Sequence, residues 1–119
     1  MQEKEMKTKQ KQRIKEFANL KPNWDSYEGL PTNENIIEQS LQFLDDITRE
    51  EILEPAVFPT PKGGTQFEWH NKGFYLEVEF LPNGKVEMFF MDSLSGEEIE
   101  KDISNNCLEV LEYIKKKKI

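Results

Sequence analysis

This chain of 119 residues has one cysteine and one histidine. A single cysteine, Cys107, excludes an internal disulfide. A zinc site needs several Cys or His ligands at close spacing, and Cys107 and His70 are far apart along the chain. The sequence contains no serine elbow motif, so it does not predict a serine-type catalytic triad. The sequence therefore predicts no metal and no cofactor.

Long apolar runs are also missing. No stretch reaches the length of a membrane span, and the start of the chain has no apolar signal region. Together with the single cysteine, this favours a reducing, cytoplasmic setting and no membrane partner. Thirteen aromatic residues are nevertheless present, which is more than disordered chains carry, so the middle of the chain should fold.

Basic residues are scarce in the middle of the chain. Residues 22–114 carry five basic and twenty acidic residues, whereas residues 1–21 carry seven basic and three acidic ones. Four lysines at 115–118 complete a net charge of −7. The acidic body is interpreted as a surface for a basic partner, as a mimic of nucleic-acid phosphates, or simply as a soluble surface.

Three helices are predicted. Apolar residues between 14 and 20 form a short stripe that ends before Pro22, and residues 1–13 precede it as a basic extension, helical or frayed. Residues 32–52 show the clearest helical spacing. A last helix is predicted to start near Ser104.

The segments TQFEWH, FYLEVEF and KVEMFF alternate apolar and polar residues, which is typical of half-buried strands. Residues 56–58 are a short candidate for an edge strand, because prolines follow. Residues 92–102 are interpreted as a loop that joins the last strand to the final helix. The predicted fold is a single α+β domain, in which a three- to four-stranded antiparallel β-meander packs against two or three α-helices, with residues 14–116 as its core.

The strand register follows from the alternation. Pairing Phe80 with Val86, and Trp69 with Phe74, places every apolar residue on one face, whereas a slip of one residue would mix the faces. The opposite face then holds Gln66, Glu68, His70, Tyr75, Glu77, Glu79, Glu87, Phe89 and Met91.

This opposite face has two features to explain. Glu79 and Glu87 become direct cross-strand neighbours, and like charges in that position are destabilising. The face is interpreted as a binding surface for a basic partner, as a weak hard-cation site, or as an ordinary solvent face. Tyr75, Phe89 and Met91 are large for a solvent face, so they indicate a protein contact or a cover supplied by the first helix or by residues 21–31.

Two motifs suggest chemistry but fit it poorly. Gly63 and Gly64 could suggest a phosphate-binding loop, yet a strand rather than a helix follows them. His70 has Glu68 two residues away but no other partner, so it is a weak candidate for a general base.

In the loop of residues 21–31, Trp24 and Tyr27 are predicted to fold back over the core edge, and Asp25 to cap a local turn.

Residues 20–90 resemble a family of small, functionally uncharacterised bacterial and phage-encoded proteins. Members carry an Asn-Trp-Asp-Gly-Tyr-Gly loop, then a Pro-Thr-Pro-x-Gly-Gly-x-Gln-x-Glu-Trp segment and a Leu-Glu-(Val/Ile)-Glu strand. Ser26 and Glu28 stand here where the family usually has glycines. The resemblance implies a shared fold and hints at a mobile-element or defence context, without implying an activity. The matching residues are Asn23, Trp24, Asp25, Tyr27, Pro59, Thr60, Pro61, Gly63, Gly64, Gln66, Glu68, Trp69, Leu76, Glu77, Val78 and Glu79.

Three functions remain open from the sequence. The first is a non-catalytic interaction protein that neutralises a basic macromolecule, as antitoxins, immunity proteins and phage inhibitors do, through the carboxylate face. The second is nucleic-acid binding through one side of the first helix, with Lys4, Lys7, Lys11 and Lys15. The third is a small enzyme that uses Glu68, His70 and Glu77.

Overall fold

The computed structural model describes the backbone of residues 2–50 and 52–117, and the side chains from residue 9 onward within those ranges. The helices are α1 (Gln2–Glu16), α2 (Glu34–Ile47) and α3 (Val110–Lys116), with short 3₁₀ turns at Phe17–Asn19 and Cys107–Glu109. The strands are β1 (Ala56–Pro59), β2 (Thr65–Asn71), β3 (Phe74–Phe80), β4 (Val86–Asp92) and β5 (Glu98–Asp102).

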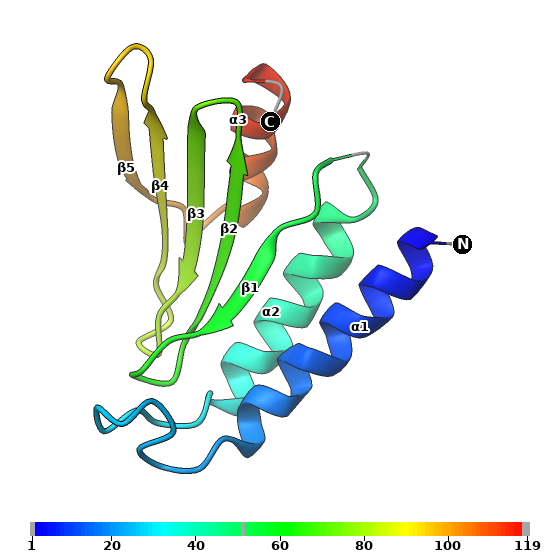
Figure 1. Cartoon of the computed structure of the whole chain (residues 1–119), viewed down its shortest axis with the longest axis vertical. Coiled ribbons are helices and arrows are strands. Elements are labelled where there is room, and N and C mark those ends of the chain that lie inside the picture. Colours follow the sequence, from blue (N-terminus) through cyan, green and yellow to red (C-terminus); the bar gives the residue numbers. More distant parts are fainter. Residues whose placement is uncertain (1, 51, 118–119) are drawn as a thin grey trace.

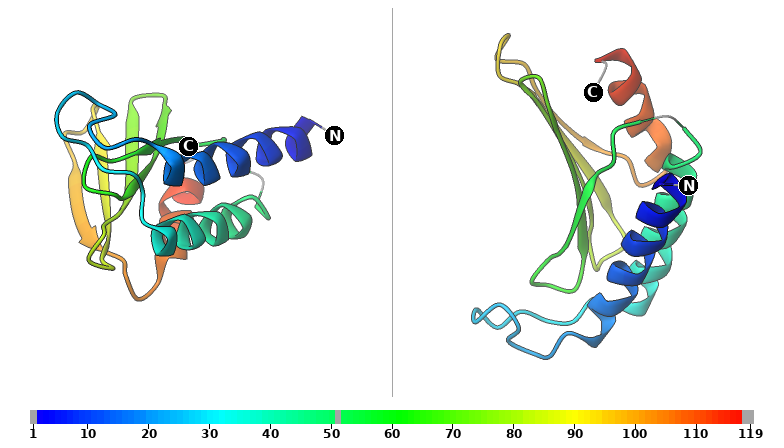
Figure 2. Two further views of the ribbon diagram at one scale, coloured as in Figure 1. Left: turned by 90° about the horizontal axis from the view of Figure 1, so that it is seen from below. Right: turned by 45° about the vertical axis from the view of Figure 1, so that its right-hand side comes forward.

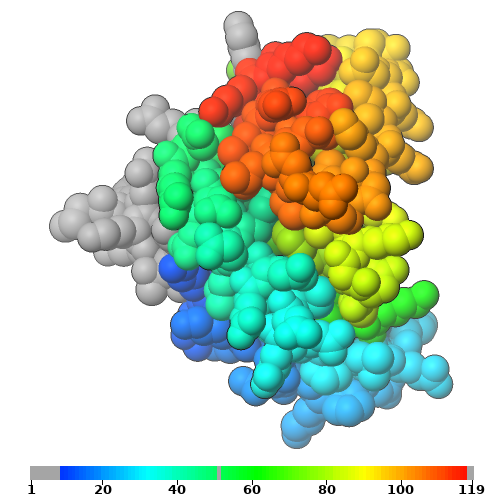
Figure 3. Space-filling view, turned by 180° about the vertical axis from the view of Figure 1, so that it is seen from behind, coloured from blue at the N-terminus to red at the C-terminus, as the bar shows by residue number. Residues whose placement is uncertain are grey.

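The strands form one antiparallel meander in the order β1-β2-β3-β4-β5, and the helices lie together on one side of it (Figures 1 and 2). Seen from behind, α2 and the C-terminal segment lie side by side across that helix side (Figure 3). This confirms the predicted α+β fold. The other side of the sheet, called the outer face below, is not covered by helices (Figure 2).

The predicted strand count was too low, because residues 98–102 form β5 rather than a loop. Ile99 is the single apolar residue of this strand, so it lacks the alternation by which strands are recognised. Its strand conformation comes from pairing with β4, from Glu87 opposite Asp102 to Met91 opposite Glu98.

The predicted register is right for the β3–β4 hairpin, where Phe80 pairs with Val86. It is wrong by two residues for the β2–β3 hairpin, where Trp69 pairs with Leu76 instead of Phe74. Lys72 and Gly73 both have positive φ, 48° and 84°, and form a tight two-residue turn. The strands therefore pair up to the turn itself, with Asn71 opposite Phe74. A shift of two residues keeps every side chain on its predicted face.

Two helix boundaries also differ from the prediction. Helix α2 ends at Ile47 instead of near residue 52, and the Thr48 hydroxyl donates to the Leu44 carbonyl oxygen at that end. The final helix begins at Val110 rather than near Ser104. The Ser104 hydroxyl accepts the Val86 backbone N–H at 2.9 Å, which ties the segment after β5 back to β4.

The core fills the space between the helices and the inner side of the sheet. Phe43 of α2 packs edge-to-face on Phe67 and Phe80, with ring centroids 4.9 and 5.2 Å away. The buried hydroxyls of Ser40 and Thr65 form a hydrogen bond of 2.7 Å between α2 and β2. These contacts hold α2 against the inner side of the sheet and leave the opposite side for the polar side chains.

No helix within residues 2–50 and 52–117 is long and apolar enough to cross a membrane.

Candidate interaction surface

The outer face consists of three cross-strand rows. Paired residues of an antiparallel sheet project to the same side, so the register fixes each row. The first row is Phe58, Gln66, Glu79, Glu87 and Asp102; the second is Ala56, Glu68, Glu77, Phe89 and Glu100; the third is His70, Tyr75, Met91 and Glu98.

Three of the seven carboxylates in these rows were missed from the sequence. Glu98, Glu100 and Asp102 belong to β5, and they join the face only because β5 pairs with β4. Acidic residues at every second position, 98, 100 and 102, were the available signal, since this is the period of a strand with one acidic side.

Carboxylates lie directly opposite one another at three places on the outer face: Glu68 with Glu77, Glu79 with Glu87, and Glu87 with Asp102. Each such like-charge pair is unfavourable by a few tenths to about 1 kcal/mol. The fold therefore tolerates an electrostatic cost at the outer face.

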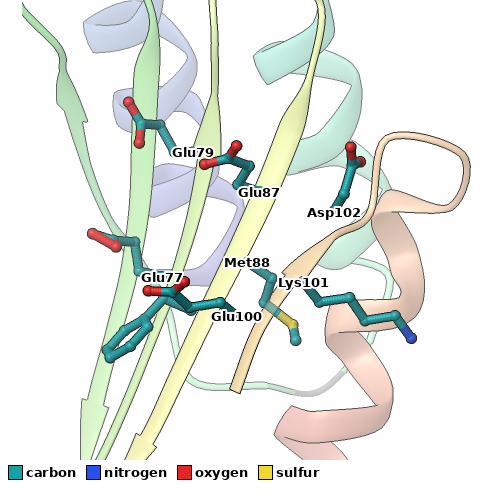
Figure 4. A pocket seen from close by; sticks show the side chains of 8 residues that line it. Glu77, Glu79, Glu87, Met88, Glu100, Lys101 and Asp102 are labelled. Atoms are coloured by element: carbon teal, nitrogen blue, oxygen red, sulfur yellow. The ribbon is translucent and has the colours of Figure 1, made fainter. Parts of the chain in front are cut away.

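Among the described residues, no lysine or arginine forms a salt bridge with these seven carboxylates. Lys101 belongs to β5 but projects to the helix side, where its amine lies 2.7 Å from Glu109 (Figure 4). Lys11 of α1 forms a salt bridge with Asp45, Lys115 of α3 with Glu50, and Lys117, just after α3, with Glu97. These four lysines are thus engaged away from the outer face, while Lys62 and Lys85 act on Glu79 and Asp102 without forming a salt bridge among the described residues.

Five of the carboxylates surround an open hollow of about 530 Å³ (Figure 4). Burial raises the pKa of Glu79, and the neighbouring charges of Glu77 and Glu87 raise it further, with Lys62 acting weakly in the opposite direction. Phe89 supplies an apolar wall of the hollow. The carboxylates of the hollow are Glu77, Glu79, Glu87, Glu100 and Asp102.

Tyr75 joins two of the opposed glutamates. Its hydroxyl lies 2.8 Å from Glu68 Oε1 and 3.1 Å from Glu77 Oε1, and Gln66 Nε2 also donates to Glu68 Oε1 at 3.0 Å. Burial and the two carboxylates raise the pKa of Tyr75 well above its ordinary value. The hydroxyl therefore keeps its proton and offsets the Glu68–Glu77 repulsion.

The aromatic residues of the outer face pack on one another. The Tyr75 ring lies 4.7 Å from His70 and 6.0 Å from Phe89, measured between centroids. Helix α1 lies on the opposite side of the sheet, so it does not cover them (Figure 2). Tyr75, Phe89 and Met91 thus form a half-buried apolar centre beside the carboxylates.

His70 does not have the surroundings of a catalytic base. Its side chain is 66% exposed, its Nε2 lies 4.0 Å from Glu68 Oε2, and it does not line the hollow. Tyr75 and Gln66 already use the Glu68 carboxylate. Within the described part of the chain, no group of three or more His, Cys, Asp or Glu side chains is placed to hold a metal ion.

The loop of residues 21–31 follows the prediction only in part. Asp25 Oδ1 accepts the backbone N–H groups of Tyr27 and Gly29, as expected for a local turn. Trp24 does not pack on the core as predicted; its indole N–H instead donates to the Leu30 carbonyl oxygen within the loop at 2.7 Å. Tyr27 does not fold back over the core, because its side chain is 86% exposed.

The loop is fastened to the segment before β2. The Leu30 N–H donates to the Pro61 oxygen at 2.7 Å, and the Asn33 N–H donates to the Gly63 oxygen at 3.1 Å. Gly63 has a φ of 94°, and Gly64 leads directly into β2. The Pro-Thr-Pro-Lys-Gly-Gly segment therefore holds the loop in place by backbone hydrogen bonds. Its two glycines redirect the chain at the start of β2.

Ser26 and Glu28 both have left-handed backbone geometry, with φ of 66° and 65°. These are the two positions at which the resembled family usually has glycine, the residue that adopts this geometry without strain. The double replacement Ser26→Gly and Glu28→Gly should raise the free energy of unfolding by about 1 kcal/mol, since relief of strain outweighs the added chain entropy. Urea denaturation measures the change, and an equal or lower stability would contradict the strain.

The basic first helix offers limited support for nucleic-acid binding. Lys11 lies 2.8 Å from Asp45 of α2, and Gln10 donates to the Pro55 oxygen at 2.8 Å, so this part of α1 packs on the protein. Lys15 is exposed. The side chains of Lys4 and Lys7 lie outside the described residues.

Comparison with known proteins identifies no relative: no family model, no curated protein and no solved structure matches this chain. The resemblance drawn from its motifs stays a prediction.

Proposed function

We propose that this protein is a non-catalytic interaction domain whose outer face binds a basic macromolecular partner and neutralises it, in the manner of antitoxins, immunity proteins and phage inhibitors. The observation that carries the proposal is the set of seven carboxylates brought together by four strands. Among the described residues, no Lys or Arg forms a salt bridge with these side chains.

The cost of assembling these charges supports a role in binding. Opposed carboxylates destabilise a sheet, and Glu79 and Glu87 could be replaced without disturbing the core, because they project away from it. A basic partner would convert this repulsion into attraction. The charge would also speed diffusional encounter, and high salt would weaken it.

The apolar centre supports a macromolecular partner over free ions. Tyr75, Phe89 and Met91 lie next to the carboxylates, and aromatic residues and methionine are enriched at protein interfaces. Arginine side chains stack on aromatic faces and also pair with carboxylates, so an arginine-rich surface fits both features. The single cysteine favours the cytoplasm as the place of this interaction.

The test compares two triple variants as bait in a bacterial lysate. The first, Glu77→Gln with Glu79→Gln and Glu87→Gln, removes charges at the hollow. The matched control, Glu38→Gln with Glu54→Gln and Glu112→Gln, removes three exposed charges outside the outer face. We expect the wild type and the control to retain a basic protein at low salt and to release it at high salt. The outer-face variant should lose most of this retention, by about tenfold or more.

Two results would contradict the proposal. One is a wild-type bait that retains no basic protein at low salt. The other is equal retention by the outer-face variant and the wild type. A circular dichroism spectrum of each variant confirms that it is folded before the comparison is made.

A further inference from the structure

Strand β5 forms an open edge of the sheet. It pairs with β4 on one side, and within residues 2–50 and 52–117 no other element lies along its other side (Figure 1). The opposite edge is more protected. Strand β1 is short and ends in Pro59, Arg13 of α1 lies 5.4 Å from the Phe58 ring, and Gln10 donates to the Pro55 oxygen just before it. Edge strands with free backbone groups are sites at which another extended segment can add.

The direction of the β5 backbone groups follows from the hydrogen bonds at the two ends of its ladder. The Ile103 N–H donates to the Val86 oxygen, and the Asp92 N–H donates to the Glu97 oxygen. In an antiparallel pair, hydrogen-bonded and non-hydrogen-bonded positions alternate. Ile99 and Lys101 therefore direct their N–H and C=O groups to β4. Glu98, Glu100 and Asp102 direct theirs outward, to the open edge.

The same three residues also point their side chains to the outer face. In an added antiparallel strand, the residues that exchange hydrogen bonds with them would lie directly opposite and project to the same side. Each of these partner residues would face a carboxylate. Lysine or arginine at those positions would form favourable cross-strand pairs, whereas acidic residues would be repelled.

This charge row argues against a second copy of the chain at the edge. If β5 paired with itself about Glu100, that residue would lie opposite its own copy, and Glu98 would lie opposite Asp102. Three like-charge pairs would form in one short ladder, which is the way natural sheets avoid edge-to-edge association.

We propose that the β5 edge accepts an extended segment of the basic partner, with Lys or Arg at every second position, which adds to the sheet as a sixth strand. The proposal rests on the proposed function and names the part of the partner that is recognised. Residues between the basic positions would project to the helix side, beside the half-buried Ile99. Apolar residues fit there, so the recognised pattern alternates basic and apolar residues.

The direct test uses a synthetic peptide, acetyl-Thr-Lys-Val-Lys-Val-Lys-Thr-amide, added to ¹⁵N-labelled protein. Its isomer with three adjacent lysines, acetyl-Thr-Val-Lys-Lys-Lys-Val-Thr-amide, has the same charge and composition without the alternation. We expect the alternating peptide to shift the amide signals of Glu98, Glu100 and Asp102 and to slow their hydrogen exchange. The isomer should bind about threefold more weakly, because at most two of its three lysines can face the acidic row in any register.

A pair of variants at one position separates backbone pairing from charge. Glu100→Pro removes the outward N–H as well as the charge, and proline is tolerated at an edge where the N–H faces solvent. Glu100→Gln removes the charge alone. We expect Glu100→Gln to weaken peptide binding about threefold, and Glu100→Pro to weaken it by about tenfold or more. Thermal denaturation checks that both variants fold.

Several outcomes overturn the edge proposal. One is that the peptide shifts no amide signals, or shifts only signals outside β5. Another is equal binding of the two peptides. A third is equal peptide binding by the Glu100→Pro and Glu100→Gln variants. The lysate assay then distinguishes the two proposals. If retention depends on Glu77, Glu79 and Glu87 but not on the Glu100 backbone, the outer face binds the partner without strand addition.

Discussion

Replacing Gly64 by alanine is expected to lower the free energy of unfolding by about 3 kcal/mol. A Cβ atom at this position would meet the backbone oxygen of Phe80 well inside contact distance, and it would also crowd the Thr60 hydroxyl at 2.8 Å. Neither group can withdraw easily. Phe80 pairs with Val86 and Thr65 in the middle of the sheet, and the Thr60 hydroxyl accepts the Gly64 N–H at 3.0 Å.

Gly84→Ala is the matched control for this result. Gly84 has a φ of 90°, but nothing lies within 4 Å of a Cβ atom built there. This variant therefore reports backbone strain alone and should cost about 1 kcal/mol. Urea denaturation of both variants gives the comparison. A Gly64→Ala variant as stable as the Gly84→Ala variant would show that the close approach to β3 does not constrain the segment.

The double replacement Glu79→Gln and Glu87→Gln is expected to raise the free energy of unfolding at pH 7 by about 1.5 kcal/mol. It removes the repulsion of Glu79 with Glu87 and of Glu87 with Asp102, and it relieves the interaction of Glu79 with Glu77. Glu38→Gln with Glu54→Gln removes the same charge away from the outer face, and it should change stability by less than about 0.5 kcal/mol. A neutral or destabilising effect of the outer-face replacement would contradict the electrostatic cost.

The pH dependence of this difference gives an independent check. Burial and neighbouring carboxylates raise the pKa of Glu79 in the folded state above its ordinary value of 4.5, so the folded state takes up this proton first as the pH falls. The repulsion is present above the folded pKa and disappears below the unfolded one. The stability advantage of the double variant should therefore shrink as the pH falls from 7 towards 4.

The wild type and the double variant must be compared at each pH, because other carboxylates make the folded state less stable as the pH falls. Hydrogen bonds to backbone N–H groups lower the pKa of Asp92, and the Ser104 hydroxyl and N–H lower that of Asp102. These groups make the folded state less stable on acidification. Asp92 is common to both proteins in the same surroundings, so the difference in stability reports mainly on Glu79 and Glu87.

Stability and binding should move in opposite directions at the outer face. The replacements that remove opposed carboxylates are expected to stabilise the fold and, under the proposed function, to weaken the partner complex. Functional sites of natural proteins are commonly less stable than the same surface would be without its function. The same variants measured in denaturation and in the lysate assay would show whether this holds for the outer face.

The sequence by itself determined which side of the sheet most residues face. In β2, β3 and β4 the alternation of apolar and polar residues has a period of two, and this assigned Glu68, Glu77, Glu79 and Glu87 to the outer side. The error of two residues in the β2–β3 register did not alter this result, because an even shift preserves the faces. The local turn of Asp25 was also predictable, since a short carboxylate side chain reaches its own backbone.

Only the tertiary structure decided which strands are neighbours and which residues meet. Strand β5 has one apolar residue, so its own sequence does not favour a strand, and its hydrogen bonds to β4 bring Glu98, Glu100 and Asp102 to the outer face. The position of the loop of residues 21–31 likewise depends on the hydrogen bond from the Leu30 N–H to the Pro61 oxygen, which joins segments far apart in sequence. Side-chain direction follows from local chain geometry, whereas strand pairing and loop closure depend on contacts between segments that are distant in sequence.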